Sequence, residues 1–104
     1  DCTLDNGCLW VLPGSEHRGL QPHAEIGGLR GVAVDEAGIA LPMAAGDAVL
    51  FGGLLLHRSL PNSTDVPRVA LYLRYCDPRV VMVGANNRPV LDDGYSWMVA
   101  GEAN

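Results

Sequence analysis

Hydrophobic residues along this chain come in short runs that Gly and Pro interrupt, and no stretch keeps a period of 3.6 residues over three turns. Short apolar runs bounded by turn residues are typical of β-strands, so the pattern predicts an all-β protein. Pro42 lies within one run and indicates an edge or bent strand. Ala45-Gly46-Asp47 predicts a turn in which Asp47 is structural. The expected strands cover residues 7–12, 31–34, 39–43, 48–51, 54–59, 68–76, 80–83 and 95–99.

The runs at 54–59 and 68–76 flank a polar loop with a proline on each side, which predicts a β-hairpin. If the hairpin closes symmetrically, His57 lies opposite Arg68, and Ser59, Tyr72 and Arg74 share their face. The other face is apolar. A stripe of imidazole, guanidinium and hydroxyl groups pointing into a β-barrel is a candidate site, because buried charge is costly unless a partner neutralises it. Taken singly, His57 and Arg68 would be ordinary strand residues.

Composition narrows the choice of function. Seven Arg, no Lys and twelve acidic residues give a formal net charge of −5, which argues against binding to nucleic acid or to an anionic membrane. The longest nearly apolar run, 48–56, is far shorter than the roughly 20 residues that a membrane span requires. Three Cys without a CxxC pair indicate reduced thiols, and no signal-peptide pattern is visible, so we expect a cytoplasmic location.

Several motifs in order along the chain carry a resemblance to a known family. They are Asn6-Gly7-Cys8-Leu9-Trp10-Val11-Leu12-Pro13-Gly14-Ser15 with His17 close by, Gly46-Asp47 before Val49-Leu50-Phe51, His57-x-Ser59-x-Pro61-Asn62, and Arg68. Over about residues 5–76 the chain resembles the C-terminal half of the phytanoyl-CoA dioxygenase family. The resemblance implies a double-stranded β-helix (a cupin-like jelly roll), present here as a single partial domain over 1–104 with a loop and tail at 84–104.

The resemblance also implies a function, that of a non-haem Fe(II)- and 2-oxoglutarate-dependent dioxygenase of the hydroxylase type, acting on a small molecule. Iron in this family is held by two His and one carboxylate, and His57 matches the distal His ligand. Arg68 matches the residue that binds the far carboxylate of 2-oxoglutarate, and Ser59 is placed to add a hydroxyl to that carboxylate. The family's His-x-Asp ligand pair is not in the sequence. We therefore expect the isolated chain to be inactive, with an N-terminal half of the same protein, or a second copy, as its partner.

Two alternatives stay open at this point. The chain is also compatible with a non-catalytic, stand-alone β-module that forms an oligomer. A cupin-type metal-binding protein would instead use His17, His23, Glu25 and His57 as ligands, although His23-Ala24-Glu25 falls where the resemblance predicts a lid loop without ligands.

Overall fold

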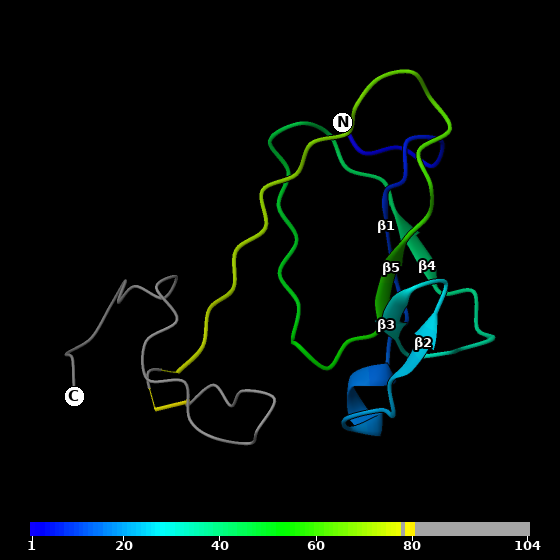
Figure 1. The fold of residues 1–104 in the computed structure, drawn as a ribbon. Coiled ribbons are helices and arrows are strands. Elements are labelled where there is room, and N and C mark those ends of the chain that lie inside the picture. The colour runs from blue at the N-terminus through cyan, green and yellow to red at the C-terminus, as the bar shows by residue number, and fades with distance from the viewer. Residues whose placement is uncertain (78, 81–104) are drawn as a thin grey trace. The chain divides into compact units, whose positions relative to one another are not determined.

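The computed structural model describes residues 1–77 and 79–80 (Figure 1). The chain divides into two units, Asp1–Ala70 and Leu71–Asn104, and all the strands of the described residues belong to the first. That unit is strand-rich, with one 3₁₀ helix among its described elements, which agrees with the all-β class predicted from the sequence. Its main feature is an open antiparallel sheet, so the closed jelly roll stays a prediction. In the described residues no helix is long and apolar enough to cross a membrane.

The sheet has three short strands in the order β4-β1-β5, namely β4 (Ile39–Leu41), β1 (Leu9–Val11) and β5 (His57–Ser59). Both neighbours run antiparallel to the central strand β1. Proline ends the strands, because it has no backbone N–H to donate to a neighbouring strand. Pro13 follows β1 closely, Pro42 follows β4 and Pro61 follows β5. These three strands lie inside the predicted runs at 7–12, 39–43 and 54–59.

Cross-strand pairing assigns the side chains to the two faces of the sheet. Val11 lies opposite Ile39 and His57, whereas Trp10 lies opposite Ala40 and Arg58. Because successive strand residues point to opposite faces, His57 shares a face with Val11, and Arg58 lies on the face of Trp10. Val11 is 8% exposed and Cys8, just before β1, is fully buried, so the small core lies along β1.

A separate hairpin joins β2 (Ala24–Ile26) to β3 (Leu29–Gly31) in a region where the sequence analysis expected a loop. Its connection is Gly27-Gly28, and both residues have positive φ, at 56° and 82°. Two-residue hairpin turns of this handedness strongly favour glycine. The Gly-Gly pair was therefore a signal for a hairpin that the hydrophobic pattern alone did not reveal. The predicted strand at 31–34 is correspondingly wrong beyond Gly31.

The predicted hairpin between 54–59 and 68–76 is not formed, and the pairing of His57 with Arg68 is wrong. β5 takes β1 as its partner, and the described residues of 68–76 contain no strand. The intervening loop is closed by its own bonds, since Asn62 Nδ2 donates to the carbonyl of Val66, and it is fastened elsewhere because Ser63 N donates to the carbonyl of Asp5.

Two further strand predictions have different outcomes. Residues 48–51 form no strand, although the turn predicted before them is present, with Asp47 Oδ2 accepting a hydrogen bond from Ala44 N at 2.9 Å. The strand at 95–99, most of the one at 80–83, and the loop and tail at 84–104 lie outside the described residues.

The backbone at Gly38 lies so close to the central strand β1 that there is no room for a side chain. We therefore expect Gly38→Ala to lower the stability of the fold strongly. Gly38 has φ +76°, and a Cβ there would lie 2.6 Å from the carbonyl oxygen of Val11. We expect Gly38→Ala to destabilise the protein by about 2–4 kcal/mol, combining left-handed backbone strain with overpacking.

Gly14→Ala is the matched control, because Gly14 has φ +84° but nothing within 4 Å of its Cβ position. It carries the backbone cost alone, about 1–2 kcal/mol. Urea unfolding compares the two variants, and equal losses of unfolding free energy would contradict the close approach.

Candidate functional site

His57 begins β5, an edge strand of the sheet, and its side chain is exposed. Its Nδ1 lies 2.9 Å from the carbonyl oxygen of Leu55, and its ring lies 4.9 Å from the ring of Phe51, centroid to centroid. A carbonyl oxygen can only accept, so Nδ1 must carry the hydrogen. In the neutral imidazole the lone pair is then on Nε2, which is the state of a metal-binding His whose other nitrogen donates to the backbone.

Ser59 lies two residues further along β5, opposite Leu9, and therefore on the same face as His57. Its side chain is exposed. Arg58 between them points to the other face, where its guanidinium lies 5.9 Å from the centre of the Trp10 ring and donates to the carbonyl of Ala37 at 3.0 Å. The structure thus brings His57 and Ser59 together on one face and separates Arg58 from them.

Arg68 is half-buried, and among the described residues its guanidinium has no hydrogen bond or ion pair, with Asp65 or with any other group. It is neither opposite His57 nor bonded to Ser59. The other arginines whose side chains are described each have a partner: Arg18 with Glu36, Arg58 with Ala37 and Trp10, Arg74 with Tyr72, and Arg79 with Asp77. A half-buried guanidinium that no described residue pairs with, in an acidic chain, is a candidate for binding an anionic ligand.

The cupin-type ligand set is not assembled. His17 Nε2 lies 3.6 Å from Oε1 of its neighbour Glu16, and His23 Nδ1 lies 2.9 Å from the carbonyl oxygen of Gln21. In the part of the chain that the structure describes, no group of three or more His, Cys, Asp or Glu could hold a metal ion. His17, His23, Glu25 and His57 therefore do not form a common site there, and this alternative has no support from the structure.

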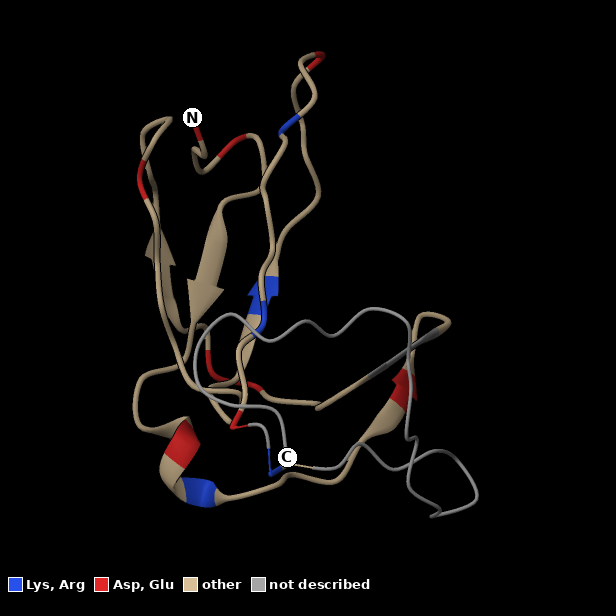
Figure 2. Ribbon diagram, turned by 90° about the vertical axis from the view of Figure 1, so that its left-hand side faces the viewer, with Lys and Arg blue, Asp and Glu red and all other residues tan. Residues whose placement is uncertain are grey.

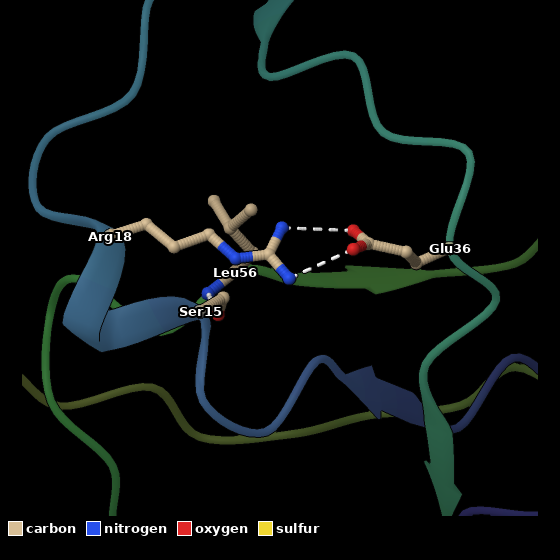
Figure 3. Close-up of polar contacts among 4 residues, drawn as sticks. All are labelled: Ser15, Arg18, Glu36 and Leu56. Carbon is tan, nitrogen blue, oxygen red and sulfur yellow. Dashed lines mark hydrogen bonds and ion pairs between the residues drawn. The ribbon is translucent and has the colours of Figure 1, made fainter.

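Sequence reasoning missed the role of Ser15, which it named only as the last residue of a family motif. Ser15 begins η1 (Ser15–Arg18), a 3₁₀ helix, and it is fully buried. Its Oγ accepts a hydrogen bond from the backbone N–H of Leu56 at 2.8 Å (Figure 3). The carbonyl of Leu56 accepts a hydrogen bond from Leu12 N at 2.9 Å. Both backbone polar groups of Leu56, the residue before His57, are thus held by the segment that follows β1.

An ion pair fastens the other end of η1. Glu16 and Arg18 give the helix an acidic and then a basic segment (Figure 2), and Arg18 reaches across to Glu36 (Figure 3). Arg18 Nη2 lies 2.8 Å from Glu36 Oε1, and Nη1 lies 3.0 Å from Oε2. The hydrogen bonds from Arg18 lower the pKa of the Glu36 carboxyl, and Glu36 raises the pKa of Arg18. The bidentate pair therefore joins η1 to the segment that leads into β4.

Comparison with known proteins identifies the family. The sequence model of phytanoyl-CoA dioxygenase (PhyH) matches residues 1–70, and the chain belongs to this family. Methylphosphonate hydroxylase of Gimesia maris is 40% identical over 75 residues, covering 70% of this chain and 28% of that protein. Phytanoyl-CoA dioxygenase of Arabidopsis thaliana is 35% identical over 81 residues, with the same coverage of 70% and 28%.

The human peroxisomal phytanoyl-CoA dioxygenase is 35% identical over 79 residues, covering 66% of this chain and 23% of that protein. The chain therefore spans about a quarter of the length of the curated relatives it matches. No solved structure gives a significant match. The family resemblance read from the motifs is confirmed, and the relatives' names place the family among the oxygenases.

The Arg18–Glu36 pair predicts a dependence of stability on pH. Because Arg18 lowers the pKa of Glu36 below its usual value near 4.5, the charged carboxylate stabilises the folded state at neutral pH. This contribution is lost as the pH falls through the lowered, folded-state pKa. We expect Glu36→Gln to lower the Tm slightly at pH 7, since the pair is exposed, and the difference from the unmodified protein to shrink as the pH falls and the carboxyl group is protonated.

Asp35→Asn, one residue away and without an ion pair among the described residues, is the control and should show no such convergence. Thermal unfolding between pH 7 and about pH 3 measures both variants. A Tm difference for Glu36→Gln that is the same at the two ends of this range would contradict a stabilising charge on Glu36.

Proposed function

We propose that this chain is part of a non-haem Fe(II)- and 2-oxoglutarate-dependent dioxygenase of the hydroxylase type, and that it supplies the distal metal ligand and the site for the cosubstrate's far carboxylate. Membership of the phytanoyl-CoA dioxygenase family supports the reaction class. The observation that carries the assignment to this chain is the contact of His57 Nδ1 with the carbonyl of Leu55. This contact leaves the lone pair of the neutral ring on Nε2, where it can bind a metal, and His57 is exposed on an edge strand.

His57 fits iron as one of three protein ligands. The other two would be the His-x-Asp pair, which does not occur in this sequence and which we propose comes from an N-terminal part of the same protein. Bound Fe(II) supports the coupled reaction in which 2-oxoglutarate, O₂ and a substrate C–H bond give succinate, CO₂ and the hydroxylated product. With one ligand of three, the isolated 104-residue chain is expected to bind Fe(II) weakly and to form no succinate.

Arg68 is proposed to bind the far carboxylate of 2-oxoglutarate. A planar guanidinium forks a carboxylate with two parallel hydrogen bonds, and Arg68 has no partner of its own among the described residues. Ser59 shares the face of His57 and offers a hydroxyl to the same carboxylate. A charged partner is needed because desolvating an unpaired carboxylate is costly.

The substrate is proposed to be a small molecule in the cytoplasm. The relatives' names refer to a phytanoyl-CoA thioester and to a methylphosphonate, so the family accepts chemically different compounds.

His57→Ala tests the metal-ligand assignment in the complete protein. Loss of an outer partner of a metal ligand costs about 10–100-fold in metal affinity, so loss of the ligand itself should cost at least about 100-fold. The fold should remain, because an exposed side chain on an edge strand contributes within about 0.5 kcal/mol of stability. Fe(II) affinity and Tm are measured together.

His23→Ala is a close control, because His23 is also exposed and its Nδ1 also contacts the carbonyl two residues earlier. It should leave Fe(II) affinity unchanged. If His57→Ala loads iron like the unmodified protein, His57 is not a ligand.

Arg68→Ala tests the cosubstrate site. A charge-assisted hydrogen bond contributes roughly 1.5–3 kcal/mol, so the KM for 2-oxoglutarate should rise about 10- to 150-fold while the Tm changes little. Arg68→Lys should recover only part of the loss, since an ammonium group cannot fork a carboxylate. Arg74→Ala is the control, because Arg74 is engaged with Tyr72, its Nε lying 3.1 Å from the phenol oxygen. A KM within about twofold of normal for Arg68→Ala would mean that Arg68 only stabilises the fold.

A further inference from the structure

One peptide group connects Ser15 to the ring of His57. The carbonyl of Leu55 accepts from His57 Nδ1 at 2.9 Å, and the N–H of Leu56 donates to Ser15 Oγ at 2.8 Å. This carbonyl and this N–H belong to the same planar unit, the peptide bond between Leu55 and Leu56. Ser15 Oγ and the imidazole are therefore at opposite ends of a single rigid group, although Ser15 is 41 residues before Leu56 in the chain.

Ser15 is itself held firmly. Its side chain is 0% exposed, and its N–H donates to the carbonyl of Leu12 at 3.1 Å. Leu12 N donates in turn to the carbonyl of Leu56 at 2.9 Å, so Leu12, Ser15 and Leu56 form a closed set of hydrogen bonds. A buried hydroxyl with a fixed backbone limits the rotation of the peptide plane whose carbonyl contacts His57.

We propose that Ser15 is a positioning residue for His57. By accepting the N–H of Leu56 it orients the Leu55 carbonyl, which keeps the hydrogen of His57 on Nδ1 and the metal-binding lone pair on Nε2. The inference rests on the proposed function for its metal, but its first step concerns only the tautomer and orientation of the ring. Hydrogen bonds in series also polarise one another, so the bond that Leu56 N–H donates to Ser15 strengthens the one that His57 donates to the Leu55 carbonyl.

His23 offers a comparison, because its ring makes a similar contact but is not connected to a buried hydroxyl. Its Nδ1 makes the same contact, at 2.9 Å, with the carbonyl of Gln21. The peptide bond after Gln21 leads to Pro22, which has no N–H, so no side chain can fix that carbonyl through the other end of its peptide group. Of these two similar imidazole contacts, only the one at His57 is coupled to a buried hydroxyl.

The test uses the complete protein and compares Ser15→Ala with Ser15→Thr, which keeps the hydroxyl. In the metal-free protein, the ¹⁵N chemical shifts of the His57 ring measure the fraction of the Nδ1–H tautomer. In a second measurement, Fe(II) is titrated anaerobically. We expect Ser15→Ala to lower the Nδ1–H fraction and to weaken Fe(II) binding about 10–100-fold, and Ser15→Thr to restore both. Should Ser15→Ala not fold, Ser15→Cys leaves no cavity and replaces the oxygen with a weak sulfur acceptor.

Cys8→Ala is the control for a loss of buried packing alone, since Cys8 is also fully buried. It should lower the Tm without changing the ring shifts or Fe(II) affinity. If Ser15→Ala behaves like Cys8→Ala, Ser15 only stabilises the fold and the inference is overturned. If His57→Ala does not change Fe(II) affinity, the metal-ligand role fails instead, and the ring shifts of the metal-free protein still decide whether Ser15 positions His57.

Discussion

The backbone of Leu56 is where the sheet, the 3₁₀ helix and the candidate metal ligand are joined. Its carbonyl is bonded to Leu12, its N–H to Ser15, and the next residue begins β5. Buried backbone groups must find partners, and here both partners come from the segment that directly follows β1. The pairing of β5 with β1 is thereby continued beyond the strand ends, and the position of His57 depends on it.

This arrangement also explains the use of a buried serine. A hydroxyl in the core costs free energy unless it is hydrogen-bonded, and an apolar residue at position 15 would leave the N–H of Leu56 without its partner. The bidentate pair between Arg18 and Glu36 joins the far end of η1 to the segment that leads into β4. Stability and site geometry are thus coupled through one short helix.

The existence of the central strands could be predicted from the sequence, but their partners could not. β1 and β4 are apolar runs followed by Pro13 and Pro42, and β5 is the polar end of the run 54–59, which Pro61 follows; these are local signals. The pairing of β5 with β1 joins segments far apart in the chain, as does the bond of Ser63 to Asp5, 58 residues away, and no local pattern encodes such contacts.

In the candidate site too, the sequence indicates which residues matter, whereas their contacts come from the structure. The motif spacing points to His57, Ser59 and Arg68, and their roles stay predictions. The tautomer of His57, the lack of an ion pair at Arg68 among the described residues and the role of Ser15 required coordinates, because each depends on which groups lie within hydrogen-bonding distance. Ser15 in particular gave no sign in the sequence beyond its place after Pro13-Gly14.

The most direct test of the account is a crystal structure of the complete protein grown anaerobically with Fe(II) and 2-oxoglutarate, with anomalous scattering recorded at the iron edge. The account predicts an anomalous peak for iron at bonding distance from Nε2 of His57. Nδ1 should still donate to the carbonyl of Leu55, and Arg68 should bind the far carboxylate of 2-oxoglutarate. Iron bound through other residues, with His57 Nε2 left in solvent, would contradict it.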